Sequence, residues 1–362
     1  MQRIGSIIVC FAVLSAISGC GSLPFTGTSS GLQDPGPIVT ECEDGMRLFE
    51  HSQLATNPLC IPEEPQRIVV LDRLSFETLI ALDVQPVGTY SGYIENFQID
   101  FPIIAERVEG IANLGTLEAL NIEALVNANP DLIIGDVPRN GANYEELSTI
   151  APTTLYQFQH SGQWQDIAAF VADIVDSTAE LERVTEQYEE RLTALQETLG
   201  AAVTTEEISV VRIMPRNVRL YARDSFLGSV IAEAGLPRPV SQDLNDAELQ
   251  EQQNSSTFYN ISDERIDLAD GDVIFIWTTG YTPEIAADAE VRLADLRNDP
   301  LSGVRWMLCN RNEFSKWAVT GSAPALLLHM PCWMISLSMS QRLIHRRWHQ
   351  IPFILSSSSI YD

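Results

Sequence analysis

The feature that most constrains the fold is one amphipathic segment near the middle of the chain. From Gln165 to Leu199, apolar residues recur every three or four positions, with Glu and Arg residues between them. This period predicts one long helix with a single buried face, and Gly200 is expected to end it. At the rise of an α-helix the segment would measure roughly 50 Å. Because a crossover within one α/β lobe is much shorter, we expect this helix to join two lobes.

The part of the chain before this helix has the pattern of a parallel α/β lobe. The apolar run 68–71 predicts a buried strand, 75–82 a short helix, and 86–88 the start of the next strand. A helix that begins at Asn121 and a buried strand at 132–134 repeat this order. Strands that alternate with helices in this way predict a parallel sheet with helices on both faces.

A similar pattern follows the long helix. Arg-Asp-Ser-Phe at 223–226 corresponds to Arg-Leu-Ser-Phe at 73–76, and Glu264 precedes a buried strand at the same spacing as Glu123. We therefore predict an α/β fold with two βαβ-type lobes, each with a parallel sheet, joined by one long backbone helix. A cleft between two such lobes is the expected ligand site.

The amino terminus has the features of an export signal. Arg3 precedes an apolar run at 7–17, which is long enough for a signal peptide and short for a membrane span. The run ends in Ile-Ser-Gly-Cys at 17–20, which resembles a lipobox, the motif whose cysteine is acylated and becomes the first residue of the mature protein. We expect residues 1–20 to form a lipoprotein signal peptide and Cys20 to carry the lipid; an ordinary cleaved signal is the alternative. The protein would then be extracytoplasmic and lipid-anchored to a membrane.

Residues 21–41 are rich in Gly, Ser, Pro and Thr and have no apolar period, which predicts a flexible tether. Cys42 and Cys60 follow the tether outside the cytoplasm, where a pair of cysteines forms a disulfide more often than a metal site. We predict a disulfide between them, with two buried free thiols as the alternative.

Charge and motif content exclude several classes of function. The chain has 49 Asp and Glu residues against 22 Lys and Arg, a formal net charge of −27, whereas nucleic-acid binding depends on basic side chains that displace counterions from phosphate. We find no nucleophile motif, P-loop or metal-binding spacing of His and Cys, and His51 and His160 are isolated in the sequence. We therefore expect neither an enzyme nor a resident metal or cofactor.

Several ordered motifs resemble one family of binding proteins. They are Pro-Gln-Arg-Ile-Val-Val-Leu-Asp at 65–72, Asn-Ile-Glu-Ala-Leu at 121–125, Asn-Pro-Asp-Leu-Ile-Ile at 129–134, Arg-Asp-Ser-Phe-Leu-Gly at 223–228 and Asn-Asp-Pro-Leu at 298–301. These motifs are similar to those of the helical-backbone solute-binding proteins that serve iron-siderophore and cobalamin importers. The resemblance covers residues 42–304. It implies an N-terminal lobe at 42–164, an interlobe helix at 165–200 and a C-terminal lobe at 201–304.

The resemblance also implies a function. Such a protein captures a ferric siderophore or a similar metal chelate between its lobes and delivers it to an ABC permease dimer with its ATPase. We expect a monomer, in which a stiff interlobe helix permits only a modest closing motion. Cobalamin and haem are alternative ligands, and a lipoprotein ligand sensor and a chelate-processing enzyme of related fold are alternative functions.

A site for a bulky anionic chelate needs cations and aromatic side chains. Arg73 and Arg223 follow predicted strand ends, where open α/β sheets bind their ligands. They are the candidate contacts for an anionic complex, and surface ion pairs are the alternative. Four aromatic residues are predicted at the same edges, with a place at the edge of the core as the alternative: Tyr90, Tyr93, Trp277 and Tyr281.

In the family that this chain resembles, one carboxylate from each lobe docks on arginines of the permease. The matching residues are Glu123 and Glu264, each of which is predicted to begin a helix at the outer face of its lobe. The alternative is that an acidic residue in the first turn only interacts with the helix dipole, which contributes about 0.3–1 kcal/mol.

The sequence changes character near Arg305. From there to Tyr361 acidic residues are almost absent, Trp, Met and Cys are frequent, and no family motif continues. If each codon began at the third base of the present one, the stretch at 330–335 would encode five residues: Ala, then one of Leu, Met and Val, and then Leu-Asp-Asp. This acidic sequence matches the last helix of the family. We predict a frameshift close to codon 305, either natural or from sequencing. Residues 305–362 would then be an aberrant tail, and the C-terminal lobe would lack its last strand and helix.

Overall fold

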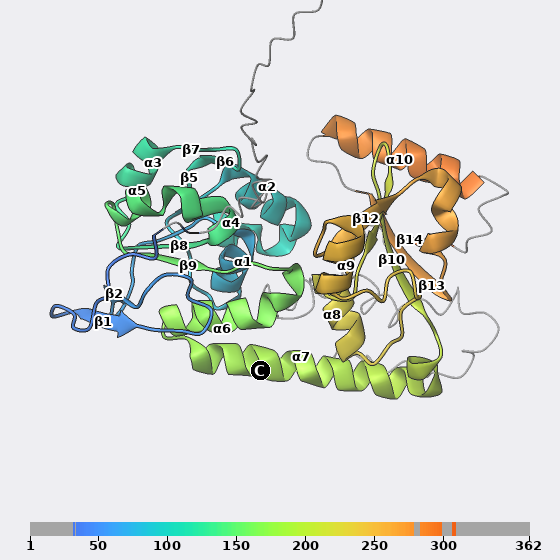
Figure 1. Cartoon of the computed structure of the whole chain (residues 1–362), viewed down its shortest axis with the longest axis horizontal. Coiled ribbons are helices and arrows are strands. Elements are labelled where there is room, and N and C mark those ends of the chain that lie inside the picture. The colour runs from blue at the N-terminus through green and yellow to red at the C-terminus, as the bar shows by residue number, and fades with distance from the viewer. Residues whose placement is uncertain (1–31, 33, 279–282, 299–305, 309–362) are drawn as a thin grey trace, which may run out of the picture.

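The structure is a computed structural model of the chain, and it describes residue 32 and residues 34–278, 283–298 and 306–308. Two α/β lobes lie side by side, and helix α7 (Thr178–Leu199) runs along one side of both (Figure 1). This arrangement confirms the predicted fold class. The signal peptide with Cys20, most of the tether, and nearly all of the tail lie outside the described residues. Within the described part, no helix is both long and apolar enough to cross a membrane.

The N-terminal lobe is built on a five-stranded sheet in which every neighbouring pair is parallel, as predicted. In spatial order the strands are β5 (Ala112–Asn113), β4 (Gly88–Thr89), β3 (Ile68–Val70), β8 (Leu132–Asp136) and β9 (Thr153–Tyr156). The connections between them contain α1 (Arg73–Ala81), α2 (Ser91–Asp100), α3 (Ile122–Asn127), α4 (Val137–Asn140) and α5 (Tyr144–Ser148). A small hairpin of β6 (Gly115–Thr116) and β7 (Ala119–Leu120) precedes α3.

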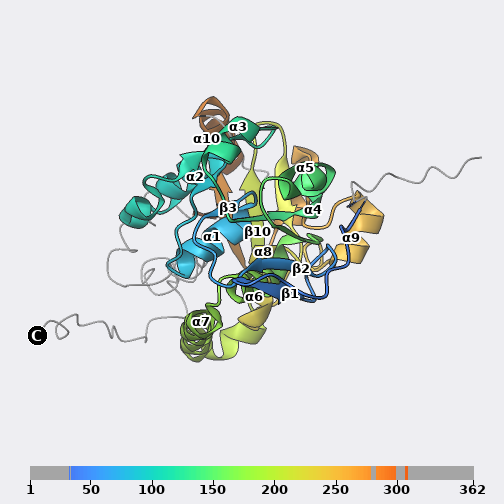
Figure 2. The ribbon, with the colours of Figure 1, turned by 90° about the vertical axis from the view of Figure 1, so that its left-hand side faces the viewer.

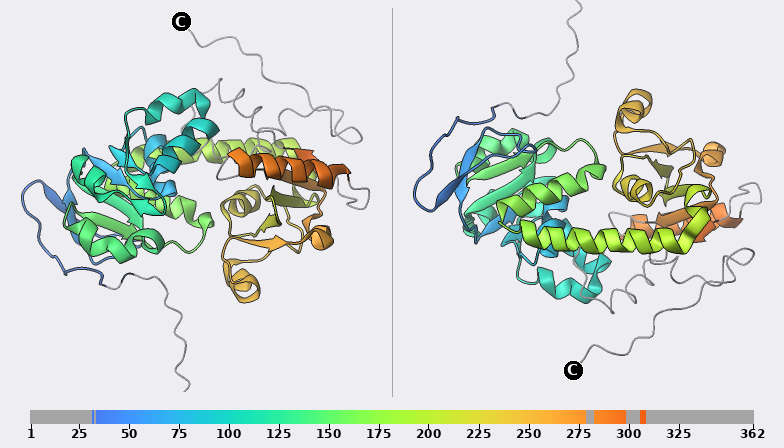
Figure 3. Two further views of the ribbon diagram at one scale, coloured as in Figure 1. Left: turned by 90° about the horizontal axis from the view of Figure 1, so that it is seen from above. Right: turned by 90° about the horizontal axis from the view of Figure 1, so that it is seen from below.

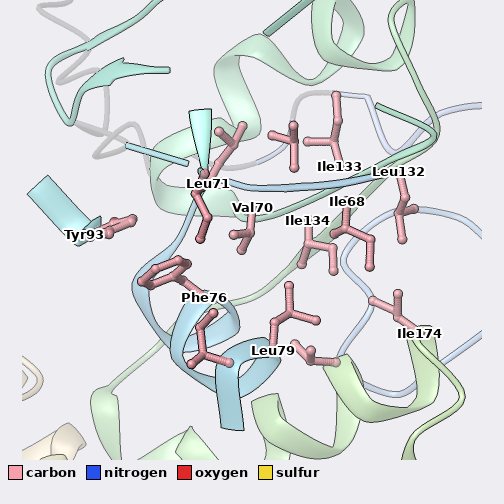
Figure 4. Close-up of a cluster of buried hydrophobic side chains, with 14 of the residues drawn as sticks. Ile68, Val70, Leu71, Phe76, Leu79, Tyr93, Leu132, Ile133, Ile134 and Ile174 are labelled. Atoms are coloured by element: carbon pink, nitrogen blue, oxygen red, sulfur yellow. The ribbon is translucent and has the colours of Figure 1, made fainter. Parts of the chain in front are cut away.

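The core of this lobe lies between the central strands and helices α1 and α6 (Trp164–Ile174). Phe76 and Leu79 of α1 and Ile174 of α6 pack in the same buried cluster as the side chains of β3 and β8 (Figure 4). Because both faces of these two strands are covered, their sequences are uninterrupted apolar runs rather than alternating ones. This is why the strands could be recognised from the sequence.

A disulfide closes the hairpin that precedes the sheet. Cys42 and Cys60 are bonded, with their Cα atoms 5.6 Å apart. Cys60 lies in β2 (Leu59–Pro62), which pairs antiparallel with β1 (Met46–Phe49). The bond restricts the unfolded chain and contributes about 3 kcal/mol to stability in the chain-entropy description.

The predicted single helix over 165–199 is two helices. Helix α6 ends at Ile174 and α7 begins at Thr178, and Asp176 between them has a left-handed backbone conformation with a φ of 53°. The N–H of Ser177 donates to the carbonyl of Ala172 (2.8 Å), which closes the end of α6. Asp tolerates this conformation better than most residues do. Because the apolar period continues across the break, the sequence pattern did not reveal it.

The two helices belong to different lobes. The buried side chains of α6 from Ile167 to Ile174 lie in the core of the N-terminal lobe, whereas Trp164 at its start and the side chains of α7 from Val184 to Leu199 pack with the C-terminal lobe. With 22 residues, α7 is roughly 33 Å long, and seen from below it extends beneath both lobes (Figure 3). The segment at 165–200 that was predicted as one interlobe helix therefore divides at the break between α6 and α7.

The C-terminal lobe has a mixed sheet, which corrects the prediction of two parallel sheets. In spatial order its strands are β12 (Phe258–Ile261), β11 (Val218–Tyr221), β10 (Ile208–Ile213), β13 (Val273–Thr278) and β14 (Trp306–Leu308). Strands β10, β13 and β14 are parallel, but β11 is antiparallel to both of its neighbours. Residues 214–217 join β10 to β11, and so short a connection allows only a hairpin, because a parallel crossover needs a dozen or more residues. The helices of this lobe include α8 (Phe226–Glu233), α9 (Asp246–Gln253) and α10 (Pro283–Asn298).

The edge strand β14 comes from the segment in which we predicted the frameshift. Trp306–Leu308 pairs in parallel with β13, so the expectation that this lobe lacks its last strand is wrong. Three residues with side chains suited to a strand are enough to extend the sheet at its edge. The expected loss of the last helix concerns residues outside the described part of the chain.

The lobes contact each other closely where β9 leads into α6. The N–H of Gly162 donates to the carbonyl of Asp224 (3.0 Å), and the N–H of Phe226 donates to the hydroxyl of Ser161 (2.9 Å). A Cβ atom at Gly162 would lie 2.6 Å from the Asp224 carbonyl oxygen. Only glycine therefore permits this approach of the two backbones.

Candidate functional site

The carboxyl ends of the strands in the N-terminal lobe face the C-terminal lobe. Because the five strands are parallel, their carboxyl ends share one edge of the sheet. From this edge β9 leads through a short loop into the 3-10 helix η3 (Ser161–Gln163), which carries the contacts to the C-terminal lobe. Helices α1, α2 and α4 begin at the same edge. Ligands of open α/β sheets bind at this edge.

Arg73 lies at the edge, as predicted. It is the first residue of α1, and 45% of its side chain is exposed. Its Nε donates to Glu77 Oε1 (2.6 Å), one turn further along the helix. Arg73 thus combines an ion pair within its own helix with a surface that a ligand could contact.

Tyr90 and Tyr93 are core residues, which corrects the prediction that they form an aromatic wall for the ligand. They are 4% and 5% exposed, respectively. The two rings meet edge to face with 5.7 Å between centroids, and the Tyr93 ring stacks beside Phe76 of α1 at 6.3 Å (Figure 4). Burial raises the pKa of both hydroxyls. A side chain near a strand end can point into the lobe or out of it, and the sequence pattern does not distinguish the two.

A group of polar side chains lies beneath the same edge, and we call it the strand-end cluster. Its members are Asp72, Tyr93, Asp136, Arg139, Asn140 and Tyr156. Asp72 follows β3 and Asp136 ends β8, and both are almost completely buried, at 1% and 0% exposed. Each carboxylate caps the helix that follows it: Asp72 Oδ1 accepts from the N–H of Ser75 (2.8 Å), and Asp136 Oδ1 accepts from the N–H of Arg139 (2.8 Å).

Arg139 is the member of the cluster that reaches the surface. Its guanidinium forms an ion pair with Asp136 Oδ2, while 44% of its side chain is exposed. Asn140 Oδ1 accepts from the N–H of Asp136 (3.2 Å), and the Tyr156 hydroxyl donates to Asp72 Oδ1 (2.7 Å). The bonds from Ser75 and Tyr156 hold the Asp72 carboxylate, and the bond from the Arg139 N–H holds the Asp136 carboxylate, which pairs with the guanidinium at the edge of the sheet.

The cluster holds two buried carboxylates beside one cation. Burial and then the nearby Asp136 carboxylate raise the pKa of Asp72 to about 6, although hydrogen bonds from Ser75 and Tyr156 oppose the shift. Burial also raises the pKa of Asp136, against the effect of Arg139. Asp72 therefore changes its charge near neutral pH.

Arg139 was not among the site residues predicted from the sequence. A signal was present, because Arg139 follows the buried strand that was predicted at 132–134, just as Arg73 follows the strand at 68–71. The same argument from strand ends would have found it. What the sequence could not show is the anchoring by Asp136, because the burial of that carboxylate depends on the packing of the sheet.

In the C-terminal lobe the structure separates the predicted contacts. Arg223 follows the carboxyl end of β11, and Trp277 lies near the carboxyl end of β13. Strand β11 is antiparallel to β10, whereas β13 is parallel to it. The two residues therefore lie at opposite edges of the sheet, which corrects the prediction of a shared edge. Arg223 is 38% exposed at its side chain and forms ion pairs with Asp243 (3.2 Å) and Asp224 (3.9 Å). Tyr281 lies outside the described residues.

The structure places the two predicted docking residues at exposed positions. Glu123 is in the first turn of α3, which Asn121 caps through a bond from the N–H of Ala124 (2.9 Å). Glu264 is in the kinked 3-10 helix η5 (Asp263–Ala269) rather than at the start of an α-helix. A hydrogen bond from the Ser262 hydroxyl lowers the pKa of Glu264.

The elements that carry these two acids lie on one side of the molecule. Asp263 in η5 forms an ion pair with Arg292 of α10. Helices α3 and α10 both lie on the side away from α7 in two perpendicular views (Figures 1 and 2). Glu123 lies on α3 of the N-terminal lobe, and Glu264 lies in η5, which is paired with α10 of the C-terminal lobe; α3 and α10 are both on the side opposite the interlobe helix (Figure 1).

His51 has a structural role in the N-terminal lobe. The His51 ring stacks against Phe49 at 6.2 Å between centroids and meets Phe170 edge-on at 5.3 Å. Across the described ranges, no group of three or more His, Cys, Asp or Glu side chains is arranged to hold a metal ion.

Comparison with known proteins matches a family across both lobes. The sequence profile of the periplasmic binding protein family matches residues 68–302. The chain is 33% identical over 219 residues to the probable siderophore-binding lipoprotein YfiY of Bacillus subtilis, covering 60% of this chain and 65% of that protein. It is 26% identical over 183 residues to the Fe(3+) dicitrate-binding periplasmic protein FecB of Escherichia coli, covering 50% of this chain and 59% of that protein. The matches thus span slightly less than two thirds of these relatives.

Solved structures show the same fold. SirA of Staphylococcus aureus in complex with staphyloferrin B superposes with a TM-score of 0.59 at 21% identity, covering 71% of this chain and 85% of that chain. The triscatecholate siderophore-binding protein FeuA of Bacillus subtilis, in complex with ferri-bacillibactin, superposes with a TM-score of 0.55 at 20% identity, covering 71% and 84%.

Proposed function

Because the chain belongs to the periplasmic binding protein family, we propose that it captures a ferric siderophore or a similar ferric chelate between its lobes and delivers it to an ABC permease. The observation that carries this proposal is that the family match spans both lobes, from residue 68 to residue 302. The names of YfiY and FecB describe a siderophore-binding and a ferric dicitrate-binding protein. A role in binding rather than catalysis agrees with this family.

The charges at the strand ends favour an anionic chelate. Arg73 and Arg139 are each nearly half exposed at the carboxyl edge of the N-terminal sheet. Arg223 is next to Asp224, whose carbonyl accepts a hydrogen bond from Gly162 of the N-terminal lobe. Guanidinium groups bind carboxylate and catecholate oxygens through charge-assisted hydrogen bonds. We propose these three arginines as ligand contacts.

Fluorescence titration with defined iron complexes tests the proposed function. Trp164 lies at the joint between the lobes, where its indole N–H donates to Ser229 Oγ (3.2 Å) and its ring meets Tyr188 at 5.4 Å and Phe226 at 5.7 Å. A change in the position of the lobes should therefore alter its emission. We expect saturable binding of ferric citrate or a ferric catecholate in preference to cobalamin and haem. If cobalamin or haem bound and neither ferric citrate nor a ferric catecholate did, the ligand class would have to be revised.

We propose that the protein is extracytoplasmic, on the periplasmic side, and anchored to a membrane through a lipid on Cys20. Changing Cys20→Ser should move the protein from the membrane fraction to the soluble fraction, because no acyl chains then hold it there. Labelling with a radioactive or alkynyl fatty acid, followed by fractionation, measures both effects. Label that persists on the Cys20→Ser protein would reject the assignment, and Cys10→Ser, a change in the same signal segment, is the matched control that should retain the lipid.

A further inference from the structure

We propose that Arg139 contacts the anionic part of a bound chelate and that a proton on Asp72 strengthens this contact, so that the strand-end cluster couples chelate binding to proton uptake. This inference deepens the proposed function and rests on it. It concerns Asp72 and Arg139, neither of which was predicted as a site residue from the sequence.

The first step is the geometry of Arg139. Its guanidinium reaches the carboxyl edge of the sheet with 44% of the side chain exposed, while its partner Asp136 is 1% exposed at the side chain. A ligand can therefore reach the cation but not the carboxylate that holds it. Asn140 Oδ1 accepts from the backbone N–H of Asp136, and the Asp136 carboxylate caps α4. Because both the backbone and the side chain of Asp136 are held, the position of the guanidinium is set before a ligand arrives, and less side-chain entropy is lost on binding.

The second step is the balance of charge. When Asp72 and Asp136 are both ionised, one guanidinium faces two carboxylates, and the cluster carries a net negative charge. The Asp72 carboxylate interacts with Arg139, because it contributes to the raised pKa of that guanidinium. An anionic ligand at Arg139 then meets repulsion from Asp72 in an interior where charges are weakly screened. A proton on Asp72 makes the cluster neutral and removes this repulsion.

The third step is the hydrogen bonding of Asp72. Its Oδ1 accepts from the Ser75 N–H and the Tyr156 hydroxyl, but within the described residues its Oδ2 is buried without a hydrogen-bond partner, as is the Tyr93 hydroxyl. A buried ionised oxygen without a donor is costly. Oδ2 is therefore the atom on which a proton is most favourable, and a protonated Oδ2 becomes a donor in its own right.

Four elements contribute the charged and titratable groups around Asp72. Asp136 belongs to β8, Arg139 to α4, Tyr93 to α2 and Tyr156 to β9. Both tyrosines have raised pKa values because they are buried, so they stay neutral in the physiological range. Burial raises the pKa of Asp136 too, but its ion pair with Arg139 favours the ionised form. Asp72, with a pKa of about 6, is therefore the group that we expect to change the charge of the cluster between pH 5 and 8.

The test compares the binding of ferric citrate by the wild type and by Asp72→Asn at several pH values. Asn keeps the helix cap and removes the titrating charge. The ratio of the two affinities cancels the protonation of the chelate itself. We expect the variant to bind about as tightly as the wild type at pH 5.5 and about tenfold more tightly at pH 7.5, where Asp72 of the wild type is ionised. An affinity ratio that does not change with pH would overturn the proposal.

A second variant keeps the proposal testable if Asp72→Asn does not fold. Tyr156→Phe removes the hydroxyl that stabilises the ionised form of Asp72. The pH at which affinity falls should therefore move upward. A midpoint that stays in place or moves downward would contradict the inference.

The arginine itself is tested by Arg139→Gln, with Arg107→Gln as matched control. Arg107 is also a partly exposed arginine of the N-terminal lobe in an ion pair, with Asp83 at 3.6 Å, but it does not belong to the cluster. We expect Arg139→Gln to lower the affinity for ferric citrate at least tenfold and Arg107→Gln to change it less than twofold. Equal effects of the two changes would count against a specific contact.

A measurement without ligand separates this inference from the proposed function. Folding raises the pKa of Asp72 from 3.8 to about 6, so the folded state binds the proton more tightly than the unfolded state. The wild type should therefore lose stability relative to Asp72→Asn as the pH rises from about 4 through 6. If the wild type binds none of the iron complexes, the proposed function and the contact at Arg139 both fail. A constant difference in stability across this pH range would show that Asp72 does not titrate there.

Discussion

Reversing the charges of Glu123 and Glu264 should nearly abolish uptake of the chelate while leaving its affinity for the isolated protein unchanged. Both acids are exposed on elements at the side of the molecule opposite α7 (Figure 1), whereas the candidate ligand contacts lie where the lobes face each other. Loss of an interfacial charge pair costs about 2–5 kcal/mol, and an arginine in place of the acid adds repulsion from the permease. Each reversal alone should lower uptake at least tenfold.

Matched controls separate docking from helix stability. Glu145 is exposed in the first turn of α5, as Glu123 is in the first turn of α3, and Glu251 is exposed on α9 of the other lobe. Glu145→Arg should therefore have the same small effect on its helix as Glu123→Arg. Glu251 lies in the last turn of α9, so Glu251→Arg changes the charge of the C-terminal lobe without weakening that helix. Both changes should leave uptake intact. The measurement is uptake of radioactive iron by cells that express the permease and ATPase together with each variant. Normal uptake by the Glu123→Arg, Glu264→Arg double variant would refute the docking assignment.

Restoring the reading frame near codon 305 should markedly raise the soluble yield of the protein and give a single cooperative unfolding transition. The match to the family ends at residue 302, close to the position that the sequence analysis proposed for the frameshift. The restored segment would supply the acidic helix that we expect to cover one face of the C-terminal sheet. An apolar face left open to water favours aggregation.

Sequencing of the genomic DNA and of the transcript around codon 305 decides the origin of the tail. Calorimetry of the two forms, with the chain as written as the control, measures the consequence for folding. An intact frame in both nucleic acids, together with a cooperative transition of the chain as written, would show that the tail is native. In that case β14 would be the natural edge of the sheet rather than the result of the altered frame.

Much of the fold could be predicted because it depends on local pattern. The strands at 68–70 and 132–136 are covered on both faces, so they appear in the sequence as unbroken apolar runs. The helical period at 165–199 predicted the apolar face of α6 and α7 correctly, since every third or fourth residue of a helix lies on one side. The same period could not reveal the break, because the left-handed Asp176 leaves the spacing of the apolar residues nearly unchanged.

The candidate site was predicted only in part. Arg73 and Arg223 lie after strand ends, as their sequence positions indicate, and both also take part in ion pairs within their own lobes. The tyrosines at 90 and 93 share the same kind of sequence position but point into the core. Nothing in the sequence around them differs enough to separate these outcomes, because the direction of a side chain after a strand depends on the helix that packs above it.

The sequence by itself determined the order of strands and helices, the two-lobed plan, and the residue types at the strand ends, since each follows from spacing along the chain. The tertiary structure alone decided that the second sheet is mixed, that α6 and α7 belong to different lobes, and that Asp72, Asp136, Arg139 and Tyr156 meet in one cluster. The physical reason is distance along the chain. Asp72 and Tyr156 are far apart in the sequence, and only the pairing of β3 with β8 and of β8 with β9 brings a buried carboxylate beneath the hydroxyl that binds it.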